Sequence, residues 1–280
     1  MTLKQSEVRH LYGPKVDPEK LLSGPKVCVG AGTGLGECYL TQTNDAGDYT
    51  CFPSEGGHVE YAPRNDVEVS LFKYLSDKFA SRHRISVERV VSGKGLANVY
   101  EYLAHANPAK IDKAVHDEFT EAGDEQGRVV AVNAKPGTLC QQAMSIMMSA
   151  YGCEVGSAAI KWIPLGGLFV TGGLTPKNIQ YIDGKDTDFM KSYLNKGRVA
   201  PVLERIPLYA VMVEDLGVRG AHKAAMMEYQ RMYCTTPVIH AKKTALAQEL
   251  QEYVWTALTV TAIVAFLAGN ACTKSFMKFK

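Results

Sequence analysis

Residues 26–36 read Lys-Val-Cys-Val-Gly-Ala-Gly-Thr-Gly-Leu-Gly and predict the first two strands of a sheet. An apolar run at 26–29 and β-type residues at 35–43 flank the glycines, which indicates a strand, a turn and a second strand. Glycines let main-chain N–H groups approach phosphate oxygens, and Thr33 adds a hydroxyl donor. The same turn is compatible with a purely structural hairpin, and it lacks the Gly-Lys-Ser/Thr ending of a P-loop.

The rest of the chain predicts strands first and then helices that alternate with strands. Residues 1–25 contain three prolines and read as a short helix followed by a connector, and residues 105–136 read as a surface excursion of helix and loop. Hydrophobic periodicity predicts further strands at 49–52, 165–170 and 207–213, and helices at 66–79, 95–104, 139–163, from 176 onward and at 220–232. This order is typical of one lobe of a nucleotide-binding α/β fold.

Charge and cysteine usage exclude several classes of protein. The 280 residues carry 31 basic and 29 acidic side chains, a net charge of +2, which argues against nucleic acid as a partner. The seven cysteines are scattered and never form a Cys-x-x-Cys pair, so neither a disulfide framework nor a zinc site is indicated. The N-terminus lacks a signal-peptide layout, and a reducing cytoplasmic location is expected.

The C-terminal part contains an uncharged segment at residues 253–273. It is long enough to span a bilayer, with lysines beyond one end, and is a candidate transmembrane helix or tail anchor that brings membrane contact. Its threonines and Asn270 also fit a buried or oligomer-packing helix. Both interpretations remain open from composition alone.

Residues 54–60 place a carboxylate and an imidazole close together, in the order Ser-Glu-Gly-Gly-His-Val-Glu. Glu55 can accept from two hydroxyls, and neutral His58 adds one donor and one acceptor, so the pair suits a small polyol. An exposed loop and a partial metal site are the alternatives.

Two further glycine-rich stretches follow predicted strands. Residues 166–173 end in a glycine pair at the carboxyl end of a strand, where α/β folds bind ligands. Residues 217–221 open the last predicted helix, where N-terminal donors favour anions. Helix packing explains either stretch equally well.

Taken together, five motifs between about residue 30 and residue 222 resemble those of bacterial-type glucokinases. They are Gly-Ala-Gly-Thr-Gly-Leu-Gly, Glu-Gly-Gly-His-Val-Glu-Tyr-Ala-Pro, Val-Glu-Arg-Val-Val-Ser-Gly-Lys-Gly-Leu, Gly-Gly-Leu-Phe-Val-Thr-Gly-Gly-Leu-Thr-Pro and Gly-Val-Arg-Gly-Ala-His. The resemblance implies a ribonuclease-H-like (actin-like ATPase) lobe, a mixed sheet flanked by helices. It assigns residues 1–25 to a connector, 26–233 to the C-terminal large lobe and 234–280 to an extra tail.

The resemblance also implies substrates and site residues. The activity is ATP-dependent phosphorylation of glucose to glucose 6-phosphate, with Mg²⁺ arriving on ATP, and family members form homodimers. The residues implied to contact glucose are Glu55, His58 and Glu88. Those implied to contact ATP are Gly32, Thr33, Gly34, Gly172 and Gly173.

The chain departs from the family pattern at both ends. The family opens on an Asp-x-Gly-Gly-Thr phosphate loop and has an Asn-Asp pair whose Asp is the catalytic base, and neither motif is in residues 1–29. We expect the base to lie upstream of Met1 and this chain to be inactive alone. A protist branch resides in glycosomes, often with a Ser-Lys-Leu-like terminus, whereas this chain ends Lys278-Phe279-Lys280.

Two other functions compete with glucose phosphorylation by this chain. One is a non-catalytic, membrane-tethered fragment that binds sugar or nucleotide. The other is a related hexose or N-acetylhexosamine kinase, which fold analogy does not exclude. The Glu-x-x-His pair and Glu88 favour glucose.

Overall fold

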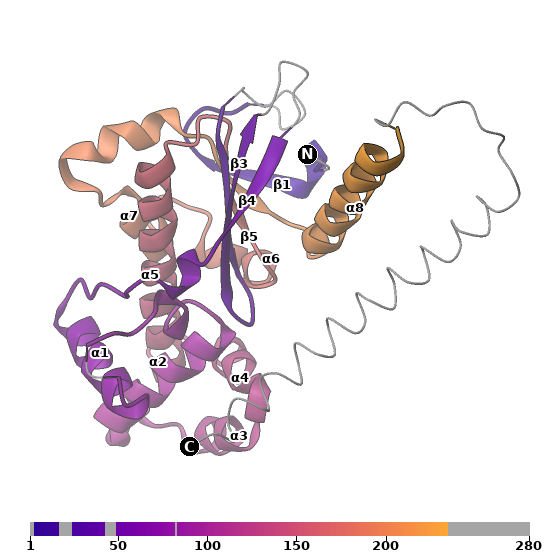
Figure 1. Ribbon diagram of the computed structural model, residues 1–280. Coiled ribbons are helices and arrows are strands. Elements are labelled where there is room, and N and C mark those ends of the chain that lie inside the picture. Colours follow the sequence, from indigo (N-terminus) through magenta and orange to yellow (C-terminus); the bar gives the residue numbers. More distant parts are fainter. Residues whose placement is uncertain (1–2, 17–23, 43–48, 82, 235–280) are drawn as a thin grey trace, which may run out of the picture. The chain divides into compact units, whose positions relative to one another are not determined.

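A six-stranded mixed sheet forms the centre of residues 1–220 (Figure 1). The computed structural model describes residues 3–16, 24–42, 49–81 and 83–234. The strands are β1 (Val8–Tyr12), β2 (Lys26–Ala31), β3 (Leu35–Gln42), β4 (Tyr49–Ser54), β5 (Leu168–Thr171) and β6 (Leu208–Val211). Their order in the sheet is β1-β6-β5-β2-β3-β4, with β2, β5 and β6 parallel and the other three strands antiparallel to their neighbours.

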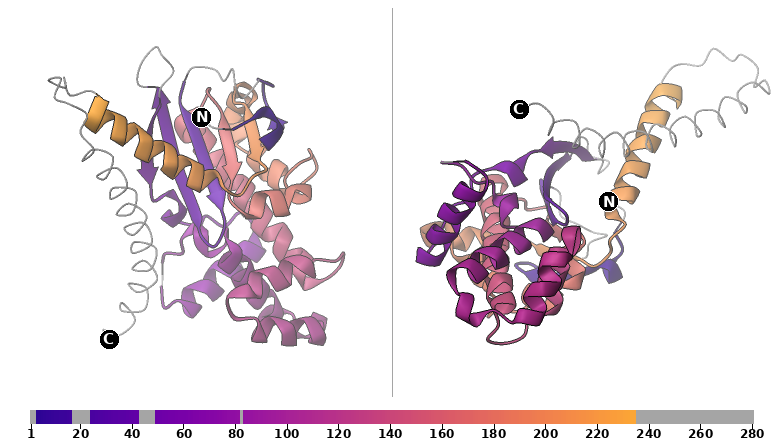
Figure 2. Two further views of the ribbon diagram at one scale, coloured as in Figure 1. Left: turned by 90° about the vertical axis from the view of Figure 1, so that its right-hand side faces the viewer. Right: turned by 90° about the horizontal axis from the view of Figure 1, so that it is seen from below.

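The helices lie mainly along one face of the sheet and beyond one of its ends. They are α1 (Asp66–Lys78), α2 (Gly93–Ala106), α3 (Lys113–Glu121), α4 (Gln126–Val132), α5 (Leu139–Trp162), α6 (Leu174–Lys177), α7 (Asp188–Leu194) and α8 (Leu216–Cys234). Figure 1 shows α5 running along the sheet and continuing among α1, α2 and α4, and the left view in Figure 2 shows α1 to α4 gathered at that end. The main core lies between the sheet and α5 and continues among α1 to α4.

Alternation of side chains explains the central hairpin of β2 and β3. Val27, Val29 and Ala31 of β2 are fully buried in the main core, together with Leu35 at the start of β3. Successive strand residues point to opposite faces, so the residues between them face the other side of the sheet. A smaller cluster covers part of that second face: Leu3, Phe169, Tyr209 and Val211.

Most predicted elements are confirmed, with two differences. Residues 8–12, expected to belong to a connector, form β1, which pairs with β6, and Met212 N–H donates to Glu7 O at 2.8 Å. Because this edge strand is only half-buried, its sequence lacks a clean apolar alternation. Residues 105–136 are not only a surface excursion, since α3 and α4 bury Phe119, Val129 and Val130 in the core.

Residues 221–280 form a second compact unit, of which the structure describes residues 221–234 of α8. The helix predicted at 220–232 is therefore confirmed, with its start at Leu216. Within the described part of the chain, none of the helices combines the length and apolar character needed to cross a bilayer. The candidate membrane segment 253–273 lies outside the described residues.

Candidate active site

The glycine turn between β2 and β3 is closed by main-chain hydrogen bonds. Gly32 N–H donates to Gly34 O at 2.8 Å, and Gly93 N–H donates to Gly32 O at 2.8 Å, which ties the turn to the start of α2. Thr33 is exposed at the tip. A Cβ added to Gly32 would meet no heavy atom within 4 Å, so the main chain here faces open space.

Glu88 lies beside this turn, in the short 3-10 helix Val87–Arg89. Its Oε2 accepts a hydrogen bond from Leu35 N–H at 2.8 Å. The same oxygen lies so close to Gly34 that a Cβ there would approach it to 2.5 Å. The carboxylate is therefore fixed at the point where the chain leaves the glycine turn.

Glu55 precedes a second 3-10 helix, Gly56–His58, which follows β4, and His58 is its last residue. Their side chains are 90% and 54% exposed, and Glu55 Oε2 lies 3.7 Å from His58 Nε2. The helix is anchored through Gly57, where a Cβ would lie 2.0 Å from Leu35 O.

The segments that carry the three predicted sugar ligands meet at one residue of the sheet, Leu35. Glu88 accepts from the N–H of Leu35, and Gly57, between Glu55 and His58, packs against its carbonyl. The Glu55 and His58 side chains are exposed, and the Glu88 carboxylate is anchored beside the glycine turn. All three are groups that can accept hydrogen bonds from hydroxyls.

Gly172 and Gly173 follow β5 at the same edge of the sheet as the glycine turn, because β2 and β5 are parallel neighbours. Gly172 has φ +86°, and a Cβ on it would lie 2.2 Å from Ala31 O. Only glycine allows the two strand ends to approach this closely.

The Tyr151 hydroxyl of α5 connects these strand ends. It lies 3.3 Å from Ala31 N, 3.1 Å from Val29 O and 3.3 Å from Thr171 O. Burial raises the pKa of Tyr151 well above its usual value, so the hydroxyl stays protonated and able to donate. The two glycine segments are thus held by one buried side chain.

Residues 217–221, a third glycine motif, form the first turns of α8. Arg219 of this motif contacts both carboxylate oxygens of Glu7 at 2.9 Å and Asp215 Oδ2 at 2.9 Å. Its guanidinium therefore connects α8 with the segment that leads into β1.

A pair of buried carboxyl groups, which the sequence motifs do not indicate, lies beneath the Glu55–His58 segment. Glu37 of β3 and Glu154 of α5 are 9% and 8% exposed. A Cβ on Gly56 would lie 2.1 Å from Glu37 Oε2. The strand alternation that buries Leu35 also directs Glu37 to the core face. This alternation is the feature of the sequence from which burial of Glu37 could be predicted.

Burial, and then the neighbouring charge of Glu154, raise the pKa of Glu37 to about 7. Burial also raises the pKa of Glu154, against the opposing effect of Lys161 and Lys196. Neither Glu37 Oε1 nor Glu154 Oε1 has a hydrogen-bond donor among the described residues, and Lys161 Nζ lies 3.9 Å from Glu154 Oε1. A proton on Glu37, which its raised pKa favours, would give the pair a donor.

We expect Glu37→Gln to stabilise the protein more at pH 8 than at pH 5. A carboxyl whose pKa rises from 4.5 to about 7 on folding favours the folded state below pH 4.5, and this stability is lost as the pH rises through 7. Between pH values below 4.5 and above 7, this change in pKa lowers the free energy of unfolding by about 3 kcal/mol. Melting temperatures of both proteins across this range measure it, and a difference that does not depend on pH would contradict the assignment.

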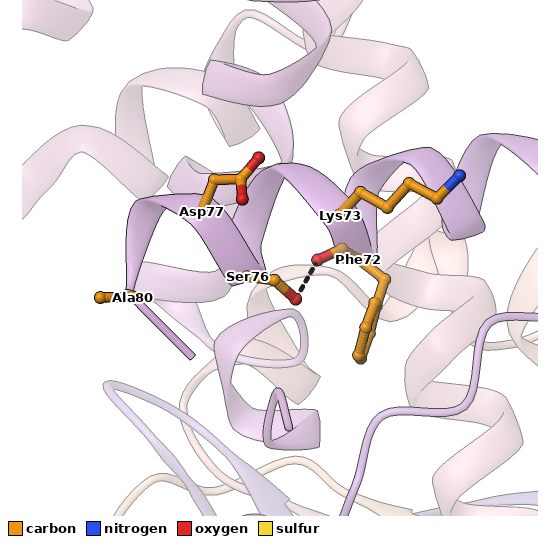
Figure 3. A pocket seen from close by; sticks show the side chains of 5 residues that line it. All are labelled: Phe72, Lys73, Ser76, Asp77 and Ala80. Atoms are coloured by element: carbon orange, nitrogen blue, oxygen red, sulfur yellow. Dashed lines mark hydrogen bonds between the residues drawn. The ribbon is translucent and has the colours of Figure 1, made fainter. Parts of the chain in front are cut away.

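A hollow on α1 contains none of the predicted site residues. Figure 3 shows that it is lined by Phe72, Lys73, Ser76, Asp77 and Ala80, with the Ser76 hydroxyl donating to Phe72 O at 2.8 Å. Across the described residues, no group of three or more His, Cys, Asp or Glu side chains is placed to bind a metal ion.

Known proteins resemble this chain in fold and in sequence. The glucokinase of Balamuthia mandrillaris, solved in complex with glucose, superposes with a TM-score of 0.63 at 20% identity, over 78% of this chain and 59% of that one. A ROK family glucokinase from Streptomyces griseus, in complex with glucose and AMPPNP, gives 0.50 at 18% identity, over 73% and 61%. These similarities confirm the expected actin-like ATPase fold.

Other relatives are more similar to this chain in sequence than these two solved proteins are. The glucokinase of Nostoc punctiforme is 38% identical over 230 residues, which are 78% of this chain and 65% of that protein. The chain thus spans a little less than two thirds of this relative's length. The sequence model of the glucokinase family matches residues 1–228, most of the chain, and the chain therefore belongs to the glucokinase family.

Proposed function

We propose that the described residues form the glucose- and ATP-binding part of an ATP-dependent glucokinase. In this reaction the γ-phosphoryl group of ATP is transferred to the 6-hydroxyl of glucose. The observation that carries the proposal is that Glu88 and the Gly56–His58 segment both contact Leu35, next to an open glycine turn.

The proposed sugar ligands are Glu55, His58 and Glu88. A carboxylate accepts from two vicinal hydroxyls, and a neutral imidazole offers one donor and one acceptor. Glu88 enters with Oε2 already accepting from Leu35 N–H, which orients the carboxylate before the sugar arrives. The glucose in the Balamuthia mandrillaris structure supports this choice of sugar.

The proposed phosphate ligands are Gly32, Thr33 and Gly34, with Gly172 and Gly173 beside the nucleotide. Open space at Gly32 allows phosphate oxygens to approach the turn. Because the Gly32 N–H already donates to Gly34 O, the proposed donors are the N–H groups of Thr33 and Gly34 and the Thr33 hydroxyl. The AMPPNP in the Streptomyces griseus structure supports a nucleotide as the second ligand. Mg²⁺ enters as part of the MgATP substrate and neutralises phosphate charge.

Gly32→Ala tests the phosphate assignment. A methyl group in this open space meets no protein atom, so the melting temperature should change by less than about 1 °C, whereas ATP binding should weaken at least tenfold. Isothermal titration of the 280-residue chain with MgATP measures the affinity. Gly36→Ala, which also meets no heavy atom within 4 Å but lies on β3 beyond the turn, is the matched control and should bind normally.

Equal ATP affinity in the Gly32 and Gly36 variants would contradict a phosphate site at the turn. Glucose 6-phosphate formation is followed on the same samples. Turnover supports phosphoryl transfer by this chain, whereas binding of both substrates without turnover favours the non-catalytic alternative.

A further inference from the structure

Three cysteines lie on neighbouring strands of the hairpin that carries the glycine turn. Cys28 of β2 pairs directly with Cys38 of β3, and Cys51 of β4 pairs with Leu40, two residues beyond Cys38. Paired residues of antiparallel strands share a face, and so do residues two apart on one strand. All three thiols therefore lie on the same face of the sheet, opposite the main core.

The three side chains interact, and Cys38 is the central one. Its thiol hydrogen bonds with the side chains of Cys28 and Cys51. These hydrogen bonds, with that of Cys28 first, lower the pKa of Cys38 to about 6, although burial opposes this. The same contacts raise the pKa of Cys28 and contribute with burial to raising that of Cys51, so the two neighbours stay protonated and donate to the Cys38 sulfur.

Cys38 is accessible to a small oxidant. It is half-buried, and Cys51 beside it is exposed, whereas Cys140 is buried in the core. A thiolate that is partly exposed reacts with peroxides far faster than a buried protonated thiol.

Strand geometry selects the partner that would close a disulfide. Directly paired residues of antiparallel strands have Cα atoms about 4.5 to 5.5 Å apart, within the range of a disulfide. Diagonal neighbours are about 7 to 8 Å apart, which requires backbone movement. Cys38 and Cys28 are a direct pair, and Cys38 and Cys51 are a diagonal one.

We propose that Cys38 is a site of reversible oxidation by hydroperoxides and that its oxidised form closes a disulfide with Cys28. The Cys38 thiolate attacks one oxygen of hydrogen peroxide, the O–O bond breaks, and a sulfenic acid and hydroxide result. The Cys28 sulfur then attacks the Cys38 sulfur, the S–O bond breaks, and water leaves with the Cys28 proton. The two thiols together lose two electrons, which the peroxide accepts, and a dithiol reductant reverses the reaction.

This modification site stands independently of the proposed function. The directly paired residues Cys28 and Cys38 lie two residues farther from the glycine turn than the paired residues Gly30 and Gly36. A disulfide at this position would fix the two strands at the base of the turn. The test therefore reads the state of each thiol rather than activity.

The 280-residue chain is exposed to hydrogen peroxide, and remaining thiols are blocked with iodoacetamide before mass spectrometry. All three cysteines lie between Lys26 and Arg64, so trypsin leaves them on one peptide, and cleavage after Glu37 and Asp48 is needed to separate them. We expect a peptide pair joined through Cys28 and Cys38 that dithiothreitol releases. Cys140, whose pKa burial raises to about 11, is the internal reference and should oxidise at least about 100-fold more slowly.

Single substitutions distinguish the cysteine that is oxidised first from the one that closes the disulfide and the one that only donates a hydrogen bond. Cys38→Ser should abolish oxidation of Cys28, and Cys28→Ser should leave a Cys38 sulfenic acid that dimedone traps. Cys51→Ala, which removes the thiol without adding a hydroxyl donor, should keep the disulfide but slow its formation, because Cys38 loses a hydrogen-bond donor. Melting temperatures show that each variant is folded, and alkylation rates against pH report the Cys38 thiolate directly in the unmodified chain.

Three results would overturn the proposal. They are oxidation of Cys38 no faster than that of Cys140, a disulfide that joins Cys38 to Cys51 in place of Cys28, and an alkylation profile in which Cys38 becomes reactive only above pH 8.

Discussion

Glu88→Gln is expected to weaken glucose binding by about 10- to 100-fold, which is the loss of a charge-assisted hydrogen bond. The carboxamide oxygen can still accept from Leu35 N–H, so the backbone contact at 2.8 Å is kept while the negative charge is removed. Isothermal titration with glucose measures the change, and the melting temperature should stay within about 2 °C because the local fold is intact.

A matched control separates this effect from a general change in charge. Glu118 is an exposed carboxylate on α3, and Glu118→Gln should leave glucose affinity unchanged. Equal affinity in the Glu88 and Glu118 variants would remove Glu88 from the sugar site.

Gly172→Ala is expected to lower the melting temperature by about 10 °C. Alanine at φ +86° is in the left-handed backbone region, which costs about 1 to 2 kcal/mol. Its Cβ would also lie 2.2 Å from Ala31 O, and this overpacking costs about 1 to 3 kcal/mol. Each kcal/mol corresponds to about 2 to 4 °C for a domain of this size. Thermal unfolding followed by circular dichroism measures the shift.

Gly197→Ala isolates the backbone part of this effect, so the difference between the two variants gives the steric part. Gly197 also has a positive φ, +55°, but a Cβ there meets no heavy atom within 4 Å. Its variant should lose only about 2 to 8 °C, from the backbone penalty alone. Equal shifts in both variants would show that close packing of the β2 and β5 ends does not contribute to stability.

The local part of the fold was predictable because it depends on neighbouring residues. The glycine turn at 30–36 and the strands beside it follow from an apolar run, glycines and a second β-type run. The strand at Val8–Tyr12 was missed because it depends on pairing with β6, nearly the whole described chain away, and is only half-buried. Local periodicity carries no information about such pairing.

The residues of the candidate site also differ in whether local sequence spacing predicts them. Glu55 and His58 are close in sequence, and their spacing indicated a shared ligand, whereas Glu88 joined them only through the family resemblance. Its contact with Leu35 is a tertiary one that spacing does not reveal. Glu37 was overlooked for a different reason, because an acidic residue in a strand is usually exposed and only its register shows that it points inward.

The cysteines show the limit of reasoning from spacing. They are scattered in the sequence without any Cys-x-x-Cys pair, yet the register of β2, β3 and β4 brings three of them together. Sheet register is fixed by the whole hairpin, so this cluster becomes visible only once the strands are aligned.

The measurement that tests the central claim most directly is a glucose titration followed by amide NMR spectra of the isotopically labelled 280-residue chain. The account predicts saturable shifts at Leu35, Gly57 and His58, and weaker ones with galactose at the same concentration. Shifts confined to the α1 hollow around Ser76, or no saturable shift at Leu35, would contradict a sugar site built around that residue.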